Sequence, residues 1–448
     1  MAAETFLERL DRVPLNAFHW KLLIISGLGW MFDAMDVILI SFVLTPIKSE
    51  FGLDVTRTGL VASAGFVGMF FGAAVSGRLA DRYGRRVVFQ VTLVVFSIGS
   101  LLSAAAPSFE LLLAARIVTG LGLGGELPVV STLVSEFAPR ASRGRFIVLL
   151  ESFWAYGTIL AGVVALLVLP AYGWRAAFLV GALPALYVAY LRRALPESPR
   201  YLAEHGRVPE ADAVVRRVER EGGGALITIS KPVAPARATA DRTQQAWIGP
   251  LFAPRYRRRT VMLWILWFGI TFTYYGMFVY LPSLFVERGF TVAQSNLYFF
   301  LSTLAQVPGY FSAAWLVERI GRRPTLVAYL VGSAVSALLF GNSGTLNDAI
   351  IYAAMLSFFN LGAWGVVYTL SPELYPTALR ATGAGTAAAV GRIGGIIGPF
   401  IVPTLVAVYS QSWVFALFMA LLLVTAGAVA LLSEETRGRS LEEIAPAA

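Results

Sequence analysis

The chain has 448 residues and a formal net charge of +9, with 57% hydrophobic and only 14% charged residues. Soluble domains carry roughly 25% charged residues, so a soluble protein of this length would need more polar surface than this composition supplies. The composition therefore argues against a soluble enzyme or binding protein and favours a protein whose solvent is the lipid bilayer.

Several kinds of reactive site are missing from the sequence. There is no Cys, and the two histidines, His19 and His205, stand far apart, which argues against disulfides and against metal sites built on Cys or His. We find neither a phosphate-binding loop of the form G-x-x-x-x-G-K-[ST] nor an H-E-x-x-H zinc motif. We therefore expect no metal and no cofactor, no direct use of ATP, and no enzymatic activity.

Twelve apolar segments follow one another along the chain. Each can cross about 30 Å of hydrocarbon at 1.5 Å per residue, the shorter ones with some local thinning of the bilayer. The first is too long for the core of a signal peptide and lacks a small-residue cleavage site. We predict an all-α membrane protein with twelve transmembrane helices, which cover residues 22–45, 58–80, 87–105, 111–134, 147–169, 176–195, 260–281, 294–316, 325–341, 349–371, 383–408 and 413–432.

The basic residues gather on one side of these predicted helices. Of the 36 Lys and Arg, 30 lie in the two termini and in the loops that share their side. Because such loops face the cytoplasm, we predict a multi-pass protein of the cell (inner) membrane with both termini cytoplasmic. The positive net charge therefore indicates how the protein is oriented in the membrane and does not indicate a nucleic-acid partner. The expected partners are the bilayer, protons and a small organic anion. We expect a functional monomer.

Charged motifs recur along the chain at a constant offset of 237 residues. The sequence Gly-Arg-Leu-Ala-Asp-Arg-Tyr-Gly-Arg-Arg at 77–86 is echoed at 318–323, and later motifs repeat Glu136 as Glu373 and Glu197 as Glu434. We therefore predict a six-helix unit repeated in the same orientation, which places the solute site between the halves near the middle of the membrane. The predicted parts are residues 1–195, a cytoplasmic linker at 196–259, and residues 260–448, which include a cytoplasmic tail.

The linker contains one segment with helical periodicity. Residues 208–221 are predicted to form a short amphipathic helix, and residues 222–245 to be flexible. We interpret this region as a solvated connector; docking of a regulator is the alternative.

These motifs carry a family resemblance over the whole chain. Residues 77–86 and their echo resemble the signature of the major facilitator superfamily, and residues 196–200 and 434–444 are similar to its sugar-porter and organic-ion branches. Asp-Ala-Met-Asp at 33–36 resembles proton-coupled carriers of aromatic acids and of nicotinate. Val-Gly-Arg-Ile-Gly at 390–394 resembles organic-anion members, in which the arginine faces the substrate.

Two features depart from the related branches. The paired glutamines of sugar porters are absent from residues 264–280, and the first two predicted helices are joined by only about a dozen residues. The resemblance therefore implies a small-anion carrier, with the bacterial nicotinate transporters as the best match.

Six charged residues lie away from the ends of the predicted helices, and a charge costs about 2.5–3.5 kcal/mol near the bilayer centre. Counting the rise per residue puts Asp36 and Arg116 at matching depth, so we predict that they pair. In similar sugar porters such a pair couples transport to protons; a permanent salt bridge is the alternative. Asp33 and Glu126 form a second candidate proton site, although each could instead bond to the backbone of a kinked helix.

Arg392 is the sole intramembrane charge of the second half. A guanidinium facing a cavity favours a carboxylate ligand, while a bridge to Asp33 or Glu126 is the alternative. Amide and aromatic side chains at similar depth complete the predicted substrate site: Asn360, Gln306, Tyr274, Tyr275, Trp364, Trp154 and Tyr156.

Charged residues at the inner ends of the predicted helices form candidate gates. Such residues are normally solvated, but their duplication argues for a role in the balance between conformations. The predicted gating residues are Asp81, Arg85, Glu136, Arg143, Glu151, Glu318, Arg322, Glu373 and Arg380.

The sequence thus predicts a proton-coupled importer of a small aromatic carboxylate, with nicotinate first on the strength of the resemblance. A carrier of benzoate-type acids is the nearest alternative. A sugar or polyol symporter is disfavoured by Arg392 and the missing glutamines. A membrane sensor without transport activity is the alternative from another class of protein.

Overall fold

The computed structural model describes residues 9–10, 13–139, 143–221 and 248–437. Within them the chain is helical, as predicted. The main helices are α2 (Ala17–Phe51), α3 (Val55–Tyr83), α4 (Arg85–Ala105), α5 (Phe109–Phe137), α6 (Arg143–Leu167), α7 (Leu169–Ala182), α8 (Pro184–Ala194), α9 (Pro199–Glu204), α10 (Val208–Glu221), α11 (Arg257–Phe278), α12 (Leu281–Glu287), α13 (Val292–Thr303), α14 (Gln306–Ile320), α15 (Arg322–Gly341), α16 (Leu346–Glu373), α17 (Thr377–Val408) and α18 (Gln411–Leu432), with a 3-10 turn at Gly249–Phe252.

Ten of the described helices are individually long and apolar enough to cross a membrane. The sixth and eighth predicted spans are each divided into two helices, α7 with α8 and α13 with α14. Pro184 begins α8 and Pro308 lies in the first turn of α14, and a proline lacks the N–H that would continue the hydrogen bonds of the preceding helix. The twelve-helix prediction is therefore confirmed, with two of the helices broken.

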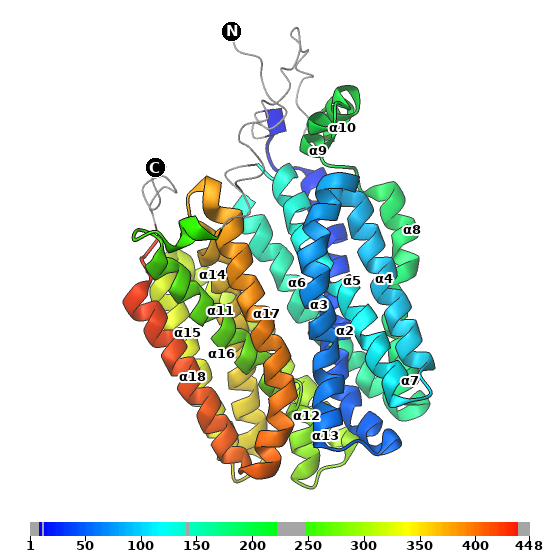
Figure 1. The fold of residues 1–448 in the computed structure, drawn as a ribbon, viewed down its shortest axis with the longest axis vertical. Coiled ribbons are helices and arrows are strands. Elements are labelled where there is room, and N and C mark those ends of the chain that lie inside the picture. The colour runs from blue at the N-terminus through cyan, green and yellow to red at the C-terminus, as the bar shows by residue number, and fades with distance from the viewer. Residues whose placement is uncertain (1–8, 11–12, 140–142, 222–247, 438–448) are drawn as a thin grey trace.

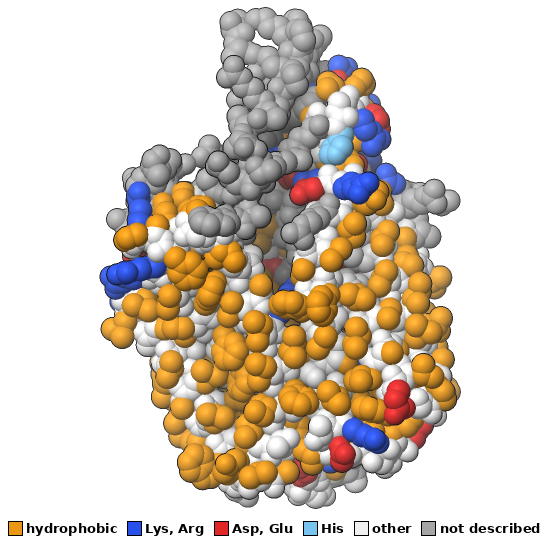
Figure 2. All heavy atoms as spheres, in the orientation of Figure 1, with side chains coloured by type: hydrophobic (Ala, Val, Ile, Leu, Met, Phe, Trp, Pro, Cys, Tyr) orange, Lys and Arg blue, Asp and Glu red, His pale blue; other side chains and the backbone are white. Residues whose placement is uncertain are grey.

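The helices form two bundles that lie side by side. Figure 1 shows α2 to α8 on one side and α11 with α14 to α18 on the other, with α17 beside α3. Hydrophobic side chains cover the flanks of both bundles, and charged side chains gather toward the two ends (Figure 2). This pattern matches a membrane-embedded surface, because lipid tails offer no partner to a charge.

Small residues bring α3 and α5 into close contact. A Cβ atom on Gly68 would lie 2.1 Å from the carbonyl oxygen of Ile117, and one on Gly124 would lie 2.1 Å from that of Met69. Neither position has room for a larger side chain, so the two backbones approach as closely as helices can. This contact fixes the position of the α5 turn that carries Glu126.

The predicted amphipathic helix at 208–221 is α10. Its apolar stripe is buried, and Arg9, 1% exposed, donates to both carboxylate oxygens of Glu219 at 2.9 and 2.7 Å and to Asp212 at 2.6 Å. The prediction did not include this ionic contact with the segment before α2, and the role of the region as a connector stays a prediction. The predicted flexible stretch lies outside the described residues.

Candidate functional site

A cavity of about 200 Å³ lies between the two halves. It is smaller than the roughly 300–1,000 Å³ of sites for drug-sized ligands, so it suits a small solute. Its walls come from α2, α3, α5 and α6 of the first half and α11, α14, α16 and α17 of the second. The lining residues are Trp30, Phe66, Met69, Ser131, Glu151, Trp154, Trp267, Thr271, Tyr274, Tyr275, Tyr310, Leu361, Trp364, Tyr368, Ala388, Arg392 and Gly395.

Helical spacing explains which residues reach the cavity. On α17 the lining residues Ala388, Arg392 and Gly395 follow one another at intervals of four and three, which is one face of a helix. The same spacing joins Trp267 to Thr271 and Tyr274 on α11. Trp267 was not among the predicted substrate residues. It could have been predicted, because it lies one turn before Thr271 on the same face of the helix as Tyr274.

Aromatic rings form most of the wall around Arg392. The indole of Trp267 lies edge-on to Trp364 and Tyr368, with ring centroids 5.7 and 5.3 Å apart. Across the cavity, Phe66 of α3 lies 4.3 Å from Tyr275, and the Trp154 indole N–H donates to the Tyr274 hydroxyl at 3.0 Å. Aromatic rings from both halves therefore line the cavity.

Arg392 is the cationic group of this wall. The described residues give its guanidinium a single hydrogen bond, from one terminal nitrogen to the backbone oxygen of Gly124 on α5 at 3.5 Å. That distance is at the long limit for a hydrogen bond. Most donors of the guanidinium are thus left to a ligand, and the alternative, a bridge to Asp33 or Glu126, is not formed among the described residues.

The other predicted substrate residues divide into two groups. Tyr274, Tyr275, Trp364 and Trp154 line the cavity. Tyr156 does not: it is 40% exposed on the outside of α6, because two residues after Trp154 a helix presents a different face.

Asn360 and Gln306 lie next to the lining positions without being among them. Both are fully buried, and their amide groups have no hydrogen-bond partner among the described residues. Gln306 lies on α14 and Asn360 on α16, two helices that pack against each other.

Glu151 lines the cavity. It is 2% exposed and borders the same space as Trp154, three residues further along α6. The loop arginines nearest to it in sequence have side chains outside the described residues, so its predicted gating role stays a prediction.

The predicted pair of Asp36 and Arg116 is present. Arg116 lies 2.9 Å from Asp36, the Ser100 hydroxyl donates to the other carboxylate oxygen at 3.0 Å, and both charged side chains are buried. The ring of Phe178 covers the guanidinium at 5.1 Å. The two charges therefore compensate each other inside the first half.

Asp33 and Glu126 meet between α2 and α5. Both are buried, and a Cβ on Gly29, one turn before Asp33 on α2, would lie 2.6 Å from a carboxyl oxygen of Glu126. None of the four carboxyl oxygens has a hydrogen-bond donor among the described residues, so the alternative of separate bonds to the backbone does not describe them.

The cavity is closed at one end of the bundle. We call the end at which α2 begins and α18 ends the basic end. At the opposite end the halves touch: the hydroxyls of Thr45 and Ser283 are 3.1 Å apart, and the rings of Phe42 and Phe299 are 4.9 Å apart. The ion pairs described at the basic end each join residues of a single half, whereas these contacts at the opposite end join the two halves.

The predicted gating residues form one cluster in each half at the basic end. In the first half Arg85 lies 2.9 Å from Asp81 and 3.7 Å from Glu136. In the second half Arg322 lies 3.7 Å from Glu318 and 3.3 Å from Glu373. The duplicated motifs thus fold into duplicated clusters.

Two further predicted gating residues lie near these clusters in the sequence. Arg380 donates to the backbone oxygen of Pro372 at 3.0 Å. Arg143 begins α6, and its side chain lies outside the described residues, so its gating role stays a prediction.

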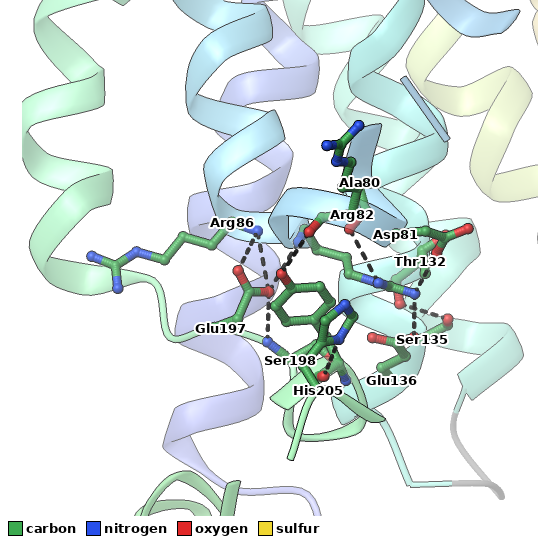
Figure 3. A network of polar contacts seen from close by, with 12 residues as sticks. Ala80, Asp81, Arg82, Arg86, Thr132, Ser135, Glu136, Glu197, Ser198 and His205 are labelled. Atoms are coloured by element: carbon green, nitrogen blue, oxygen red, sulfur yellow. Dashed lines mark hydrogen bonds and ion pairs between the residues drawn. The ribbon is translucent and has the colours of Figure 1, made fainter. Parts of the chain in front are cut away.

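A carboxylate from a distant loop caps the helix that follows each cluster. Glu197 accepts hydrogen bonds from the backbone N–H groups of Arg85 and Arg86 at 3.0 and 3.2 Å, at the start of α4 (Figure 3). In the second half Glu435 accepts from Arg322 and Arg323 at 2.9 and 3.0 Å. The structural counterpart of Glu197 is therefore Glu435, and not Glu434 as the constant offset suggested.

The caps depend on the glycine that precedes each helix. Gly84 and Gly321 both have φ +102°, and a Cβ there would lie 2.2 and 2.5 Å from the capping carboxylates. Only glycine combines this backbone conformation with so close an approach.

Removing either cap is expected to destabilise the protein moderately. Glu197→Ala and Glu435→Ala should each lower the free energy of unfolding by about 0.5–2 kcal/mol, because helix N–H groups lose their acceptor. The two losses should add in the double variant, since the caps lie in different halves. Unfolding in mixed micelles measures this, with exposed Glu221→Ala as the control; losses no larger than the control's would contradict the capping role.

Comparisons with known proteins agree with this architecture. A family model described as "Sugar (and other) transporter" matches residues 18–448. The chain is 47% identical over 441 residues to the niacin transporter NiaP of Acinetobacter baylyi, which is 98% of this chain and 99% of that protein. It is 31% identical over 483 residues to organic cation/carnitine transporter 7 of Arabidopsis thaliana, covering 97% of this chain and 95% of that protein.

A solved structure shows the same fold. The partially occluded inward open conformation of the xylose transporter XylE from E. coli matches with a TM-score of 0.77 at 18% identity, covering 95% of this chain and 100% of that one. The relatives and the fold are those of membrane transporters and not of enzymes. The chain therefore belongs to the Sugar (and other) transporter family, within the major facilitator superfamily.

Proposed function

We propose that this transporter imports nicotinate, or a closely similar single-ring aromatic carboxylate, together with protons by alternating access. The observation that carries the proposal is the position of Arg392, a guanidinium with most of its donors free in a small cavity walled by aromatic rings. The 47% identity to a protein named as a niacin transporter supports the choice of nicotinate.

The cavity supplies what such an anion requires. The planar fork of Arg392 can bind a carboxylate through two parallel hydrogen bonds, which a point charge cannot do. Tyr275 and Tyr368 line the same cavity as that fork, and the ring of Trp364 lies 5.7 Å from that of Tyr368. Their rings can pack on the face or edge of an aromatic ligand.

The distribution of basic residues supports an orientation. With the basic end in the cytoplasm, the cavity described here is closed toward the outside by the contact of Thr45 with Ser283. The protein would then be in an inward-facing state in the cell (inner) membrane, working as a monomer with both termini cytoplasmic.

Binding measurements with matched ligands test the substrate class. Nicotinate is expected to bind purified protein about 30- to 150-fold more tightly than nicotinamide, because the amide cannot form a charge-assisted pair worth about 2–3 kcal/mol. Benzoate, which keeps the carboxylate, should bind far better than the amide. Thermal-shift and equilibrium-binding titrations measure the ratio; nicotinamide binding as tightly as nicotinate would overturn the anion proposal.

A further inference from the structure

Two buried acids lie outside the cavity, Asp33 on α2 and Glu126 on α5, and Glu126 reaches α2 beside Gly29, one turn before Asp33. Asp33 is 1% exposed and Glu126 is fully buried. If both were ionised, their four oxygens would all be acceptors, and none has a donor among the described residues. One proton resolves the conflict, because a protonated carboxyl group can donate to its ionised neighbour.

We propose that Asp33 and Glu126 form a shared proton-binding site, and that the proton bound there is the one transported with the aromatic carboxylate. The inference rests on the proposed function, since it assigns the coupling proton of that transport to one pair of side chains. The chemistry is reversible protonation: a carboxylate oxygen gains a proton from water on one side of the membrane and returns it to water on the other.

The neighbouring charged groups leave this pair without a cation of its own. On α2, Asp36 is three residues further and already holds Arg116 of α5 at 2.9 Å. With the Ser100 hydroxyl as a second donor, both carboxyl oxygens of Asp36 already have partners. The positive charge nearest in sequence is therefore already in use.

The other helices around the pair contribute one buried acid, Glu151, and no ion pair to either carboxyl group among the described residues. From α4, the ring of Phe89 closes the space beside Gly29, where a Cβ would lie 2.6 Å from a Glu126 oxygen. From α8, Tyr187 directs its hydroxyl to the backbone oxygen of Ile25. From α3, Ser76 packs at Gly125, and Glu151 of α6 lines the cavity.

A contact across the two halves links this site to the substrate cavity. Arg392 donates to the backbone oxygen of Gly124, which lies two residues before Glu126 on the same turn of α5. Without a bound anion, Arg392 has no ion pair among the described residues, and its charge favours the ionised form of the acid pair. A bound carboxylate neutralises Arg392 and so favours the protonated form, which makes anion and proton binding mutually cooperative, as symport requires.

Transport assays in proteoliposomes test the assignment. Asp33→Asn and Glu126→Gln are expected to lower nicotinate accumulation driven by a pH gradient at least about tenfold, because the coupling site is lost. Exchange of labelled for unlabelled nicotinate without a gradient should persist, which also shows that the variants fold. Glu110→Gln, an exposed acid at the start of the same helix, is the matched control and should accumulate nicotinate as the parent does.

Binding measurements at several pH values supply a second test. The parent is expected to take up about one proton per nicotinate bound in weakly buffered solution, and its affinity should fall by up to about tenfold per pH unit above the titration. Glu126→Gln should show neither effect while retaining affinity.

The outcomes separate the inference from the proposed function. A parent that neither binds nor exchanges nicotinate refutes the proposed function and, with it, this assignment. A parent that binds nicotinate without proton uptake overturns the assignment alone. Gradient-driven accumulation that survives in both acid-pair variants also overturns the assignment. If that accumulation is then lost in the double variant Asp36→Asn with Arg116→Met, the transported proton belongs to the ion pair.

Discussion

Arg392→Ala is expected to lower the affinity for nicotinate by about 100-fold, because a bidentate charge-assisted pair contributes on the order of 3 kcal/mol in a water-poor cavity. Arg392→Lys should recover only part of the loss, since a flexible point charge cannot reproduce the planar fork. Equilibrium binding to purified protein gives both values. The matched control is Arg57→Ala, which removes an exposed arginine at the end of the bundle opposite the basic end.

The comparison of acid with amide makes this test specific. If Arg392 binds the carboxylate, Arg392→Ala should weaken nicotinate strongly and nicotinamide hardly at all, so that the difference between the two ligands shrinks. If the arginine only stabilises the cavity, both ligands should weaken together. An unchanged preference for nicotinate in Arg392→Ala would place the anion site elsewhere.

Arg116→Met is expected to lower the free energy of unfolding by about 3–5 kcal/mol, because it leaves the buried carboxylate of Asp36 without its cation. Adding Asp36→Asn should recover most of that loss, since the double variant buries no ionised group at this position. Unfolding in mixed micelles, analysed as a double-mutant cycle, measures the coupling between the two side chains. Equal losses in the single and double variants would show that the ion pair contributes nothing.

A second ion pair of the same half provides the control. Arg175 lies 2.7 Å from Glu50, which is closer than Arg116 to Asp36, but the two side chains are 40% and 41% exposed. Water screens such a pair, so Arg175→Met should cost no more than about 1 kcal/mol. The contrast isolates burial, and not distance, as the cause of the larger effect.

Depth in the membrane could be predicted from the sequence, because it depends only on the rise of 1.5 Å per residue along a helix. That single dimension was enough to pair Asp36 with Arg116, to put Arg392 at the level of the cavity, and to expect Glu126 beside Asp33. The repeat of charged motifs likewise predicted two similar halves before any helix was placed.

The depth of a residue in the membrane does not show toward which side of its helix the side chain points. Tyr156 and Trp154 stand at nearly the same level of α6, yet Trp154 faces the cavity while Tyr156 is 40% exposed. Only the packing of α6 against α2 and α14 decides which side is inward.

Contacts between distant segments were also decided by the tertiary structure alone. The choice of Glu435 and not Glu434 as the cap of α15 depends on where the chain turns after α18, which a fixed sequence offset cannot show. The sequence by itself therefore determined the number, level and duplication of the helices, since these follow from hydrophobic length and repeated residues. The tertiary structure decided which side chains meet, because that requires the angle at which each helix faces its neighbours.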